Sequence, residues 1–206
     1  TLNIETIQAL EGRGVPVSTF KELQQEAWQC SIDDFQDVIG FQRYLSRTPK
    51  GGIMQELHRL FLAGVPWDEY HFVKLRERQL GRIRSEITER FRLPVKHSRR
   101  VLLIPDFTQT LHHGEVYYRS SSQEVRLSDG QEVVVLRNPS YHPSNVLKAC
   151  IPDTKHLDPR LLKLEDVLVL GAREDTESAS PAETLCGADF DGDDALIIWD
   201  PRVVQK

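Results

Sequence analysis

The 206-residue sequence has few cysteines and no long apolar run. Its three cysteines, Cys30, Cys150 and Cys186, are widely spaced and form no CxxC or CxxH pair. This pattern argues against both a disulfide framework and a zinc site, and it favours a reducing compartment, the cytoplasm or the nucleus. Because no apolar run approaches the roughly 20 residues that span a bilayer, we expect no membrane partner.

The chain also lacks an initiator methionine and a secretory signal peptide. It begins TLNIETIQAL, without the basic and then apolar stretch that is typical of such a leader. We therefore expect an excised piece of a longer protein. The hydrophobic fraction of 39% and the charged fraction of 28% are ordinary for a globular chain.

The net charge of −5 hides two segments of opposite sign. Between residues 74 and 100, ten basic residues against three acidic ones give +7, and between residues 152 and 200, thirteen acidic residues against four basic ones give −9. Such a pair of segments suits a protein that holds a polyanion and also binds a metal. Charge alone nevertheless favours two solvated faces of an ordinary protein.

The spacing of apolar residues changes near residue 97. Before it, apolar residues recur at helical spacing, as in residues 18–30, and TPKGG at 48–52 interrupts the helical stretches. After it, short β-rich runs alternate with polar turns. These runs are VLLI (101–104), GEVYYR (114–119), QEVRL (123–127), QEVVVLR (131–137), DVLVL (166–170) and ALIIW (195–199). This order predicts an α+β fold, with helices over 1–97 and a compact β-barrel or sandwich over 98–206.

Two segments have special compositions. The basic segment 72–91 has an apolar stripe among its charges, so it could be a packed connector helix or could line an RNA channel. We favour the connector, with phosphate contacts as a secondary role. The acidic, serine-rich loop 171–187 is expected to be the least structured part of the chain.

The stretch CGADFDGDDALIIWD, residues 186–200, holds five aspartates within twelve positions: Asp189, Asp191, Asp193, Asp194 and Asp200. An EF-hand loop that starts at Asp189 would need glycine at its sixth position, but Gly192 falls at the fourth. The spacing therefore argues against an EF-hand. A solvated turn and a site for a catalytic metal remain.

Asp189, Asp191 and Asp193 alternate strictly, and in an extended backbone this spacing sends the three carboxylates to one side. Converging carboxylates repel one another unless a cation is present, and hard oxygen ligands suit Mg²⁺ or Mn²⁺. Gly192 either permits a sharp bend or leaves room for a ligand to approach the backbone. Spacing alone supports the metal site and the solvated turn equally.

The stretch ADFDGD resembles the Asp-x-Asp-Gly-Asp signature of polymerases built on double-psi β-barrels. Its flanks resemble, in order and separation, the cell-encoded RNA-dependent RNA polymerases of RNA silencing. These flanks are IQALEGRGVPVSTFKELQQEA, GEVYYR, VVVLRNPSYHPSNVLKA, LDPRLLKLEDVLVLGAR and the trailing WDP. The chain departs from the family pattern at Ala188 and in HPSN, where the family usually has His-Pro-Gly-Asp, but the three aspartates are intact.

The resemblance implies a helical connector over 1–97, followed over 98–206 by a double-psi β-barrel that catalyses template-directed nucleotidyl transfer. The alternating aspartates would hold Mg²⁺, or Mn²⁺, while the partners would be RNA template and product, NTPs and the other domains of a parent polymerase. Arg137 is the candidate for a phosphate or ribose contact, or else a structural arginine that ends a strand. Asp194 and Asp200 are expected to support the site.

The resembled family uses a second barrel, which supplies basic residues for the incoming NTP, and nothing in the sequence resembles it. We therefore expect the fragment alone to be inactive. The alternative is a non-catalytic barrel module that binds RNA or a protein partner while its aspartates form a turn.

Overall fold

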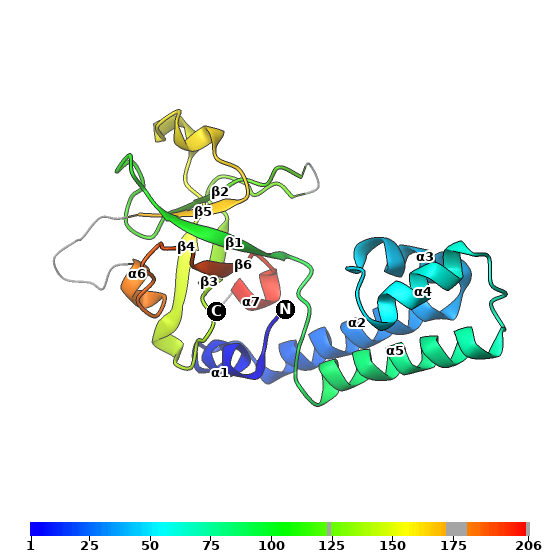
Figure 1. Ribbon diagram of the computed structural model, residues 1–206. Coiled ribbons are helices and arrows are strands. Elements are labelled where there is room, and N and C mark those ends of the chain that lie inside the picture. The colour runs from blue at the N-terminus through cyan, green and yellow to red at the C-terminus, as the bar shows by residue number, and fades with distance from the viewer. Residues whose placement is uncertain (123–124, 172–180, 205–206) are drawn as a thin grey trace. The chain divides into compact units, whose positions relative to one another are not determined.

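The computed structural model describes residues 1–122, 125–171 and 181–204. The chain divides into two compact units, one made of Thr1–Asn3 and Phe20–Pro94, the other of Ile4–Thr19 and Val95–Lys206. The first unit is helical, and the second holds all strands of the described residues (Figure 1). The prediction of an α+β fold with an N-terminal helical region is confirmed. Residues 4–19 belong to the unit that holds the strands.

The helices of the first hundred residues pack through aromatic and aliphatic side chains. They are α1 (Ile4–Gly12), α2 (Val17–Gln36), α3 (Val38–Arg47), α4 (Ile53–Leu62) and α5 (Tyr70–Thr88). Asp37 caps α3 by accepting a hydrogen bond from the Gly40 N–H at 2.7 Å. The core of the helical unit consists of Phe41, Tyr44, Leu45, Met54, Leu57, Phe72 and Leu75. Among the described helices, none combines the length and apolarity needed to cross a membrane.

The basic segment forms α5, which buries an apolar stripe and leaves most of its arginines exposed. Arg76 is the exception, because its guanidinium lies 3.3 Å from the ring centre of Trp67 and donates a hydrogen bond to the Trp67 carbonyl oxygen. Burial lowers the pKa of Arg76. This arginine therefore packs inside the helical unit, and both the connector role of α5 and an RNA-channel role for its other arginines stay predictions.

The second unit is a six-stranded sheet that curls into a nearly closed barrel (Figure 1). The strands are β1 (Ser98–Pro105), β2 (Val116–Tyr118), β3 (Glu132–Leu136), β4 (Val146–Cys150), β5 (Val167–Leu170) and β6 (Asp194–Ile198). Their order is β2-β5-β1-β6-β3-β4, and only the β1–β5 pair of these strands is parallel. An isolated bridge between Glu115 and Cys150 joins the two outer strands, so the sheet closes at this seam.

The strands differ in two places from the β-rich runs expected from the sequence. The strand β4 was not among the predicted β-rich runs. Of the predicted run 123–127, residues 125–127 are not a strand, and residues 123–124 lie outside the described residues. Residues 172–180 of the acidic loop also lie outside them.

Alternate side chains of the strands point into the barrel, as the period of a β-strand requires. Val101 and Leu103 of β1, together with Ala195 and Ile197 of β6, belong to one buried cluster. Short helical elements complete the unit. They are η1 (Pro143–Asn145), η2 (Thr154–His156), η3 (Leu161–Lys163), α6 (Pro181–Thr184) and α7 (Pro201–Val204).

The helix α1 belongs to the barrel unit because it packs against the HPSN turn. The Arg13 guanidinium donates to the Val146 carbonyl oxygen at 2.8 Å. A Cβ atom added at Gly12 would lie 2.3 Å from Cγ of Pro143, so only glycine permits this close approach. The HPSN turn is therefore a docking point for α1.

Candidate metal centre

The three alternating aspartates lie in the segment that connects α6 to β6, directly before the first residue of β6. Two contacts anchor this segment to the barrel. The backbone oxygen of Asp193 accepts a hydrogen bond from the Leu103 N–H of β1 at 2.8 Å. Phe190, between the first two aspartates, packs against the barrel core. The carboxylates therefore stand on a segment that is attached to the sheet at both points.

The carboxylates of Asp189, Asp191 and Asp193 converge, with one oxygen of each within 4.8 Å of the others. The backbone that brings them together is not extended, because φ is +61° at Phe190 and +125° at Gly192. The expectation that an extended backbone aligns them is therefore wrong. The aspartates converge through a turn with left-handed residues between them.

Gly192 is required by the conformation of this turn. A φ of +125° is rarely adopted by a residue with a side chain. A Cβ atom at this position would meet none of the described atoms within 4 Å, so the space beside the glycine is open. The contact of a ligand with this backbone stays a prediction.

The charges of the cluster perturb its protonation. The interaction with the Asp191 carboxyl lowers the pKa of Asp189. The hydrogen bond between these two side chains and, after it, the negative charge of Asp189 raise the pKa of Asp191. This is the behaviour expected when carboxylates are gathered and their mutual repulsion favours retaining a proton.

Arg137, directly after β3, lies against the cluster. Its guanidinium forms an ion pair with Asp193, and its Nη1 donates to the Cys186 carbonyl oxygen at 3.2 Å. The other carboxylate oxygen of Asp193 accepts from the Asp189 N–H at 3.2 Å. Arg137 therefore holds the turn together, and a contact with phosphate or ribose stays a prediction.

Asp194 and Asp200 have partners other than the three clustered aspartates, and a supporting role for them stays a prediction. Arg100 on β1 pairs with both carboxylate oxygens of Asp194, and its hydrogen bonds lower the pKa of Asp194. Asp200 is buried and accepts two hydrogen bonds from the Arg202 guanidinium, at 3.0 and 2.9 Å, which lower its pKa. Spacing along the sequence does not predict the pair of Arg100 and Asp194, because the two residues are brought together only by the pairing of β1 with β6.

The donor set fits a hard divalent cation. Three carboxylates supply oxygen ligands, which Mg²⁺ and Mn²⁺ prefer, and the raised pKa of Asp191 reflects negative charge that such a cation would offset. The cluster thus has the ligand chemistry of a site for a hard divalent cation.

The whole chain matches a known family. A family model described as RNA dependent RNA polymerase matches residues 1–206. This chain belongs to the RNA-dependent RNA polymerase family. The resemblance to the cell-encoded enzymes of this family is therefore confirmed.

A plant relative within this polymerase family is Probable RNA-dependent RNA polymerase 1 of Oryza sativa subsp. japonica. It is 26% identical over 213 residues, which cover 98% of this chain and 27% of the rice protein. RNA dependent RNA polymerase QDE-1 from Thielavia terrestris has a similar fold, with a TM-score of 0.77 and 21% identity. That likeness covers 99% of this chain and 25% of the fungal chain. The chain thus spans about a quarter of the length of both polymerases.

Proposed function

We propose that this chain is the metal-binding barrel of an RNA-dependent RNA polymerase, which transfers nucleotides from NTPs to an RNA product on an RNA template. The observation that carries the proposal is the convergence of Asp189, Asp191 and Asp193 beside the first residue of β6. Membership of the polymerase family supports it.

The three aspartates are the proposed ligands of Mg²⁺, with Mn²⁺ as a substitute. The bound cation would lower the pKa of the attacking 3′-hydroxyl and neutralise the negative charge of the triphosphate. Arg137 keeps the Asp193 carboxylate in the cluster, and its guanidinium is the proposed contact for a phosphate or ribose of the substrate. Gly192 leaves open space through which a ligand could approach the backbone.

The remaining partners follow from the length of the relatives. Since the chain spans about a quarter of them, we propose that other domains, including a second barrel with basic residues for the NTP, complete the active site. RNA silencing in the cytoplasm or nucleus is the proposed biological setting. The 206-residue chain alone should therefore not extend an RNA primer, and robust extension would contradict this part of the proposal.

The metal site is tested by calorimetric titration of the chain with Mg²⁺ and Mn²⁺. Asp191→Ala should abolish the binding seen in the wild type, because it removes one of three ligands. Asp194→Ala is the matched control, since it removes a neighbouring carboxylate that pairs with Arg100 instead. Equal binding in the wild type and in Asp191→Ala would overturn the metal site.

The polymerase activity is tested in the parent protein. Asp191→Ala should eliminate RNA synthesis there, whereas Asp194→Ala should retain most of it. A parent protein that binds RNA but never incorporates nucleotides, with or without the substitution, would instead support the non-catalytic module.

A further inference from the structure

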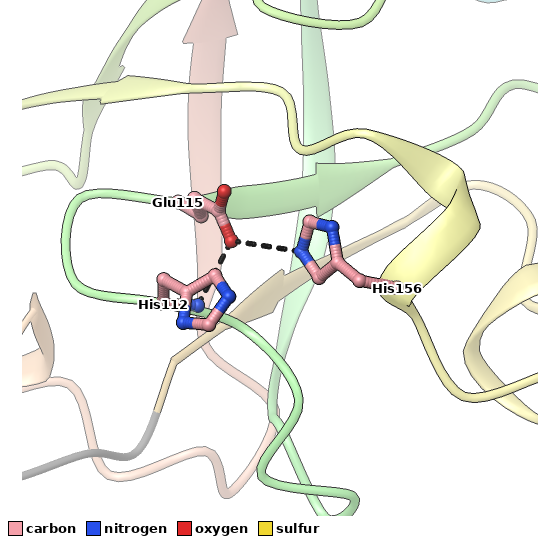
Figure 2. A group of neighbouring side chains, drawn as sticks. All are labelled: His112, Glu115 and His156. Carbon is pink, nitrogen blue, oxygen red and sulfur yellow. Dashed lines mark hydrogen bonds and ion pairs between the residues drawn. The ribbon is translucent and has the colours of Figure 1, made fainter.

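A second cluster of metal-ligand side chains lies in the barrel unit, apart from the aspartates. His112, Glu115 and His156 each offer one ligand atom, and these atoms lie within 4.8 Å of one another. Figure 2 shows the Glu115 carboxylate beside both imidazole rings. The nearest Glu115 oxygen is 3.4 Å from Nε2 of His156, and the two rings are 5.0 Å apart between centres.

Two local structures bring these residues together. His112 and Glu115 stand at the ends of a tight turn, in which the Glu115 N–H donates to the His112 oxygen at 3.1 Å. Gly114 permits this turn with its φ of +78°. The Glu115 carboxylate also accepts from the His112 N–H at 2.8 Å, so the backbone already fixes its direction.

The third residue comes from across the seam of the barrel. His156 ends η2, shortly after β4, whereas Glu115 directly precedes β2. The Glu115–Cys150 bridge joins these outer strands, with the Cys150 N–H donating to the Gly114 oxygen at 2.9 Å. The cluster therefore connects the two edge strands at a seam that few backbone hydrogen bonds cross.

The ligand types differ from those of the aspartate cluster. Two imidazoles and one carboxylate are the ligand set of many three-residue Zn²⁺ sites, whereas Mg²⁺ prefers oxygen. Tetrahedral geometry with Zn–N bonds of about 2.05 Å places ligand atoms about 3.3 Å apart, so atoms that lie within 4.8 Å of one another need to approach by about 1.5 Å at most. The Glu115 side chain is 15% exposed and that of His156 is 34% exposed, which leaves an entry path for an ion.

A simple ion pair explains less of this arrangement. An ion pair would require only a protonated His156 beside Glu115, and it would leave the nearby ring of His112 without a role. The low cysteine content does not bear on the cluster, because none of its ligands is a cysteine.

We infer that His112, Glu115 and His156 bind a borderline divalent transition metal ion of the Zn²⁺ class, which links the two edges of the barrel. Water would complete the coordination shell. This site needs neither the aspartate cluster nor polymerase activity.

The test is titration of the 206-residue chain with Co²⁺, followed by its visible d–d absorption, and with Zn²⁺ in a calorimeter. Both titrations contain saturating Mg²⁺, which occupies oxygen ligands but competes poorly for imidazoles. Asp191→Ala is titrated in parallel and should bind Co²⁺ as the wild type does. This comparison distinguishes Co²⁺ binding at the inferred site from binding at the aspartate cluster.

His156→Ala and Glu115→Gln remove one ligand each, and His113→Ala is the matched control because His113 is adjacent but outside the cluster. The loss of a group that hydrogen-bonds to a metal ligand costs about 10–100-fold in metal affinity, so we expect the loss of a ligand itself to cost at least as much. His113→Ala should bind as the wild type does. Circular dichroism in EDTA establishes that each variant is folded.

The thermal midpoint gives a second readout. Zn²⁺ should raise the midpoint of the wild type and of His113→Ala, and it should not raise that of His156→Ala. Wild-type affinity in His156→Ala, or a wild type that shows neither tetrahedral Co²⁺ absorption nor Zn²⁺ binding, would overturn the inference.

Discussion

Asp106 is buried at the end of β1, in the loop that leads to the histidine cluster. The residue is 2% exposed, and its carboxylate accepts hydrogen bonds from the loop that follows it. One oxygen accepts from the Thr108 N–H at 2.8 Å and the Thr108 hydroxyl at 2.5 Å, and the other accepts from the Leu111 N–H at 2.9 Å. Asp106 thus determines the conformation of the loop directly before His112.

The substitution Asp106→Asn keeps the shape but replaces one acceptor oxygen with an NH₂ group. In either orientation of the amide, its NH₂ group faces an N–H donor, that of Thr108 or that of Leu111. A buried donor without a partner costs about 1–3 kcal/mol, and the lost charge strengthens this effect. We expect the variant to lose about 2–3 kcal/mol of unfolding free energy, which lowers the thermal midpoint by about 5–10 °C for a chain of this size.

The effect should depend on pH. Burial raises the pKa of Asp106, but the hydrogen bonds from Leu111 and Thr108 outweigh it, so the pKa lies below its ordinary value. A depressed pKa in the folded state stabilises the protein above the unfolded pKa of about 3.9, and this stability is lost as pH falls through the folded pKa. The difference between wild type and Asp106→Asn should therefore be largest near neutral pH and shrink in acid.

The assay is urea unfolding between pH 7 and pH 3, combined with hydrogen exchange of residues 106–111. Asp129→Asn, at an exposed aspartate, is the matched control and should change stability by less than about 0.5 kcal/mol. If Asp106→Asn were as stable as this control at pH 7, or if its deficit grew in acid, the reasoning would be refuted.

Two further substitutions test the packing around the aspartates and α1. Arg137→Ala removes the cation that pairs with Asp193, so we expect the unfolding free energy in EDTA to fall by about 1–3 kcal/mol. Adding Mn²⁺ should raise the thermal midpoint of this variant more than that of the wild type, and an equal rise would contradict this. Gly12→Ala should destabilise the barrel unit by about 1–3 kcal/mol, because its Cβ would collide with Pro143. The control is Gly81→Ala, in an exposed part of α5, which should be neutral or stabilise the protein by up to about 1 kcal/mol. Equal unfolding curves for the two glycine variants would disprove the collision.

The sequence was most informative where the cause is local. The helices end where TPKGG predicts a break, with α3 ending at Arg47 and α4 beginning at Ile53. Alternation also selected the three aspartates that the structure gathers. The expected reason for their convergence was nevertheless wrong, because the backbone turns at Phe190, whose ring packs against the barrel core, and spacing reveals neither feature.

Features that depend on strand pairing could not be predicted. The strand β4 has the unremarkable sequence VLKAC, and it forms because all five residues pair with β3. The histidine cluster has a faint local signal, His112 and Glu115 three positions apart around Gly114. His156 joins them only because the Glu115–Cys150 bridge closes the sheet, and no spacing along the chain encodes that closure.

The ion pair between Arg137 and Asp193 connects the aspartate signature to its surroundings. Three converging carboxylates would repel one another strongly, but the guanidinium offsets part of this charge, while the pKa of Asp191 stays raised. The cluster can therefore persist before a cation arrives, and an arriving cation competes with Arg137 for the Asp193 carboxylate. A cation that takes this carboxylate leaves the Arg137 guanidinium beside the cluster, where it could meet the phosphate of an incoming nucleotide. Under this proposal one arginine would serve the turn first and the substrate second, so the two roles proposed for Arg137 would be successive rather than exclusive.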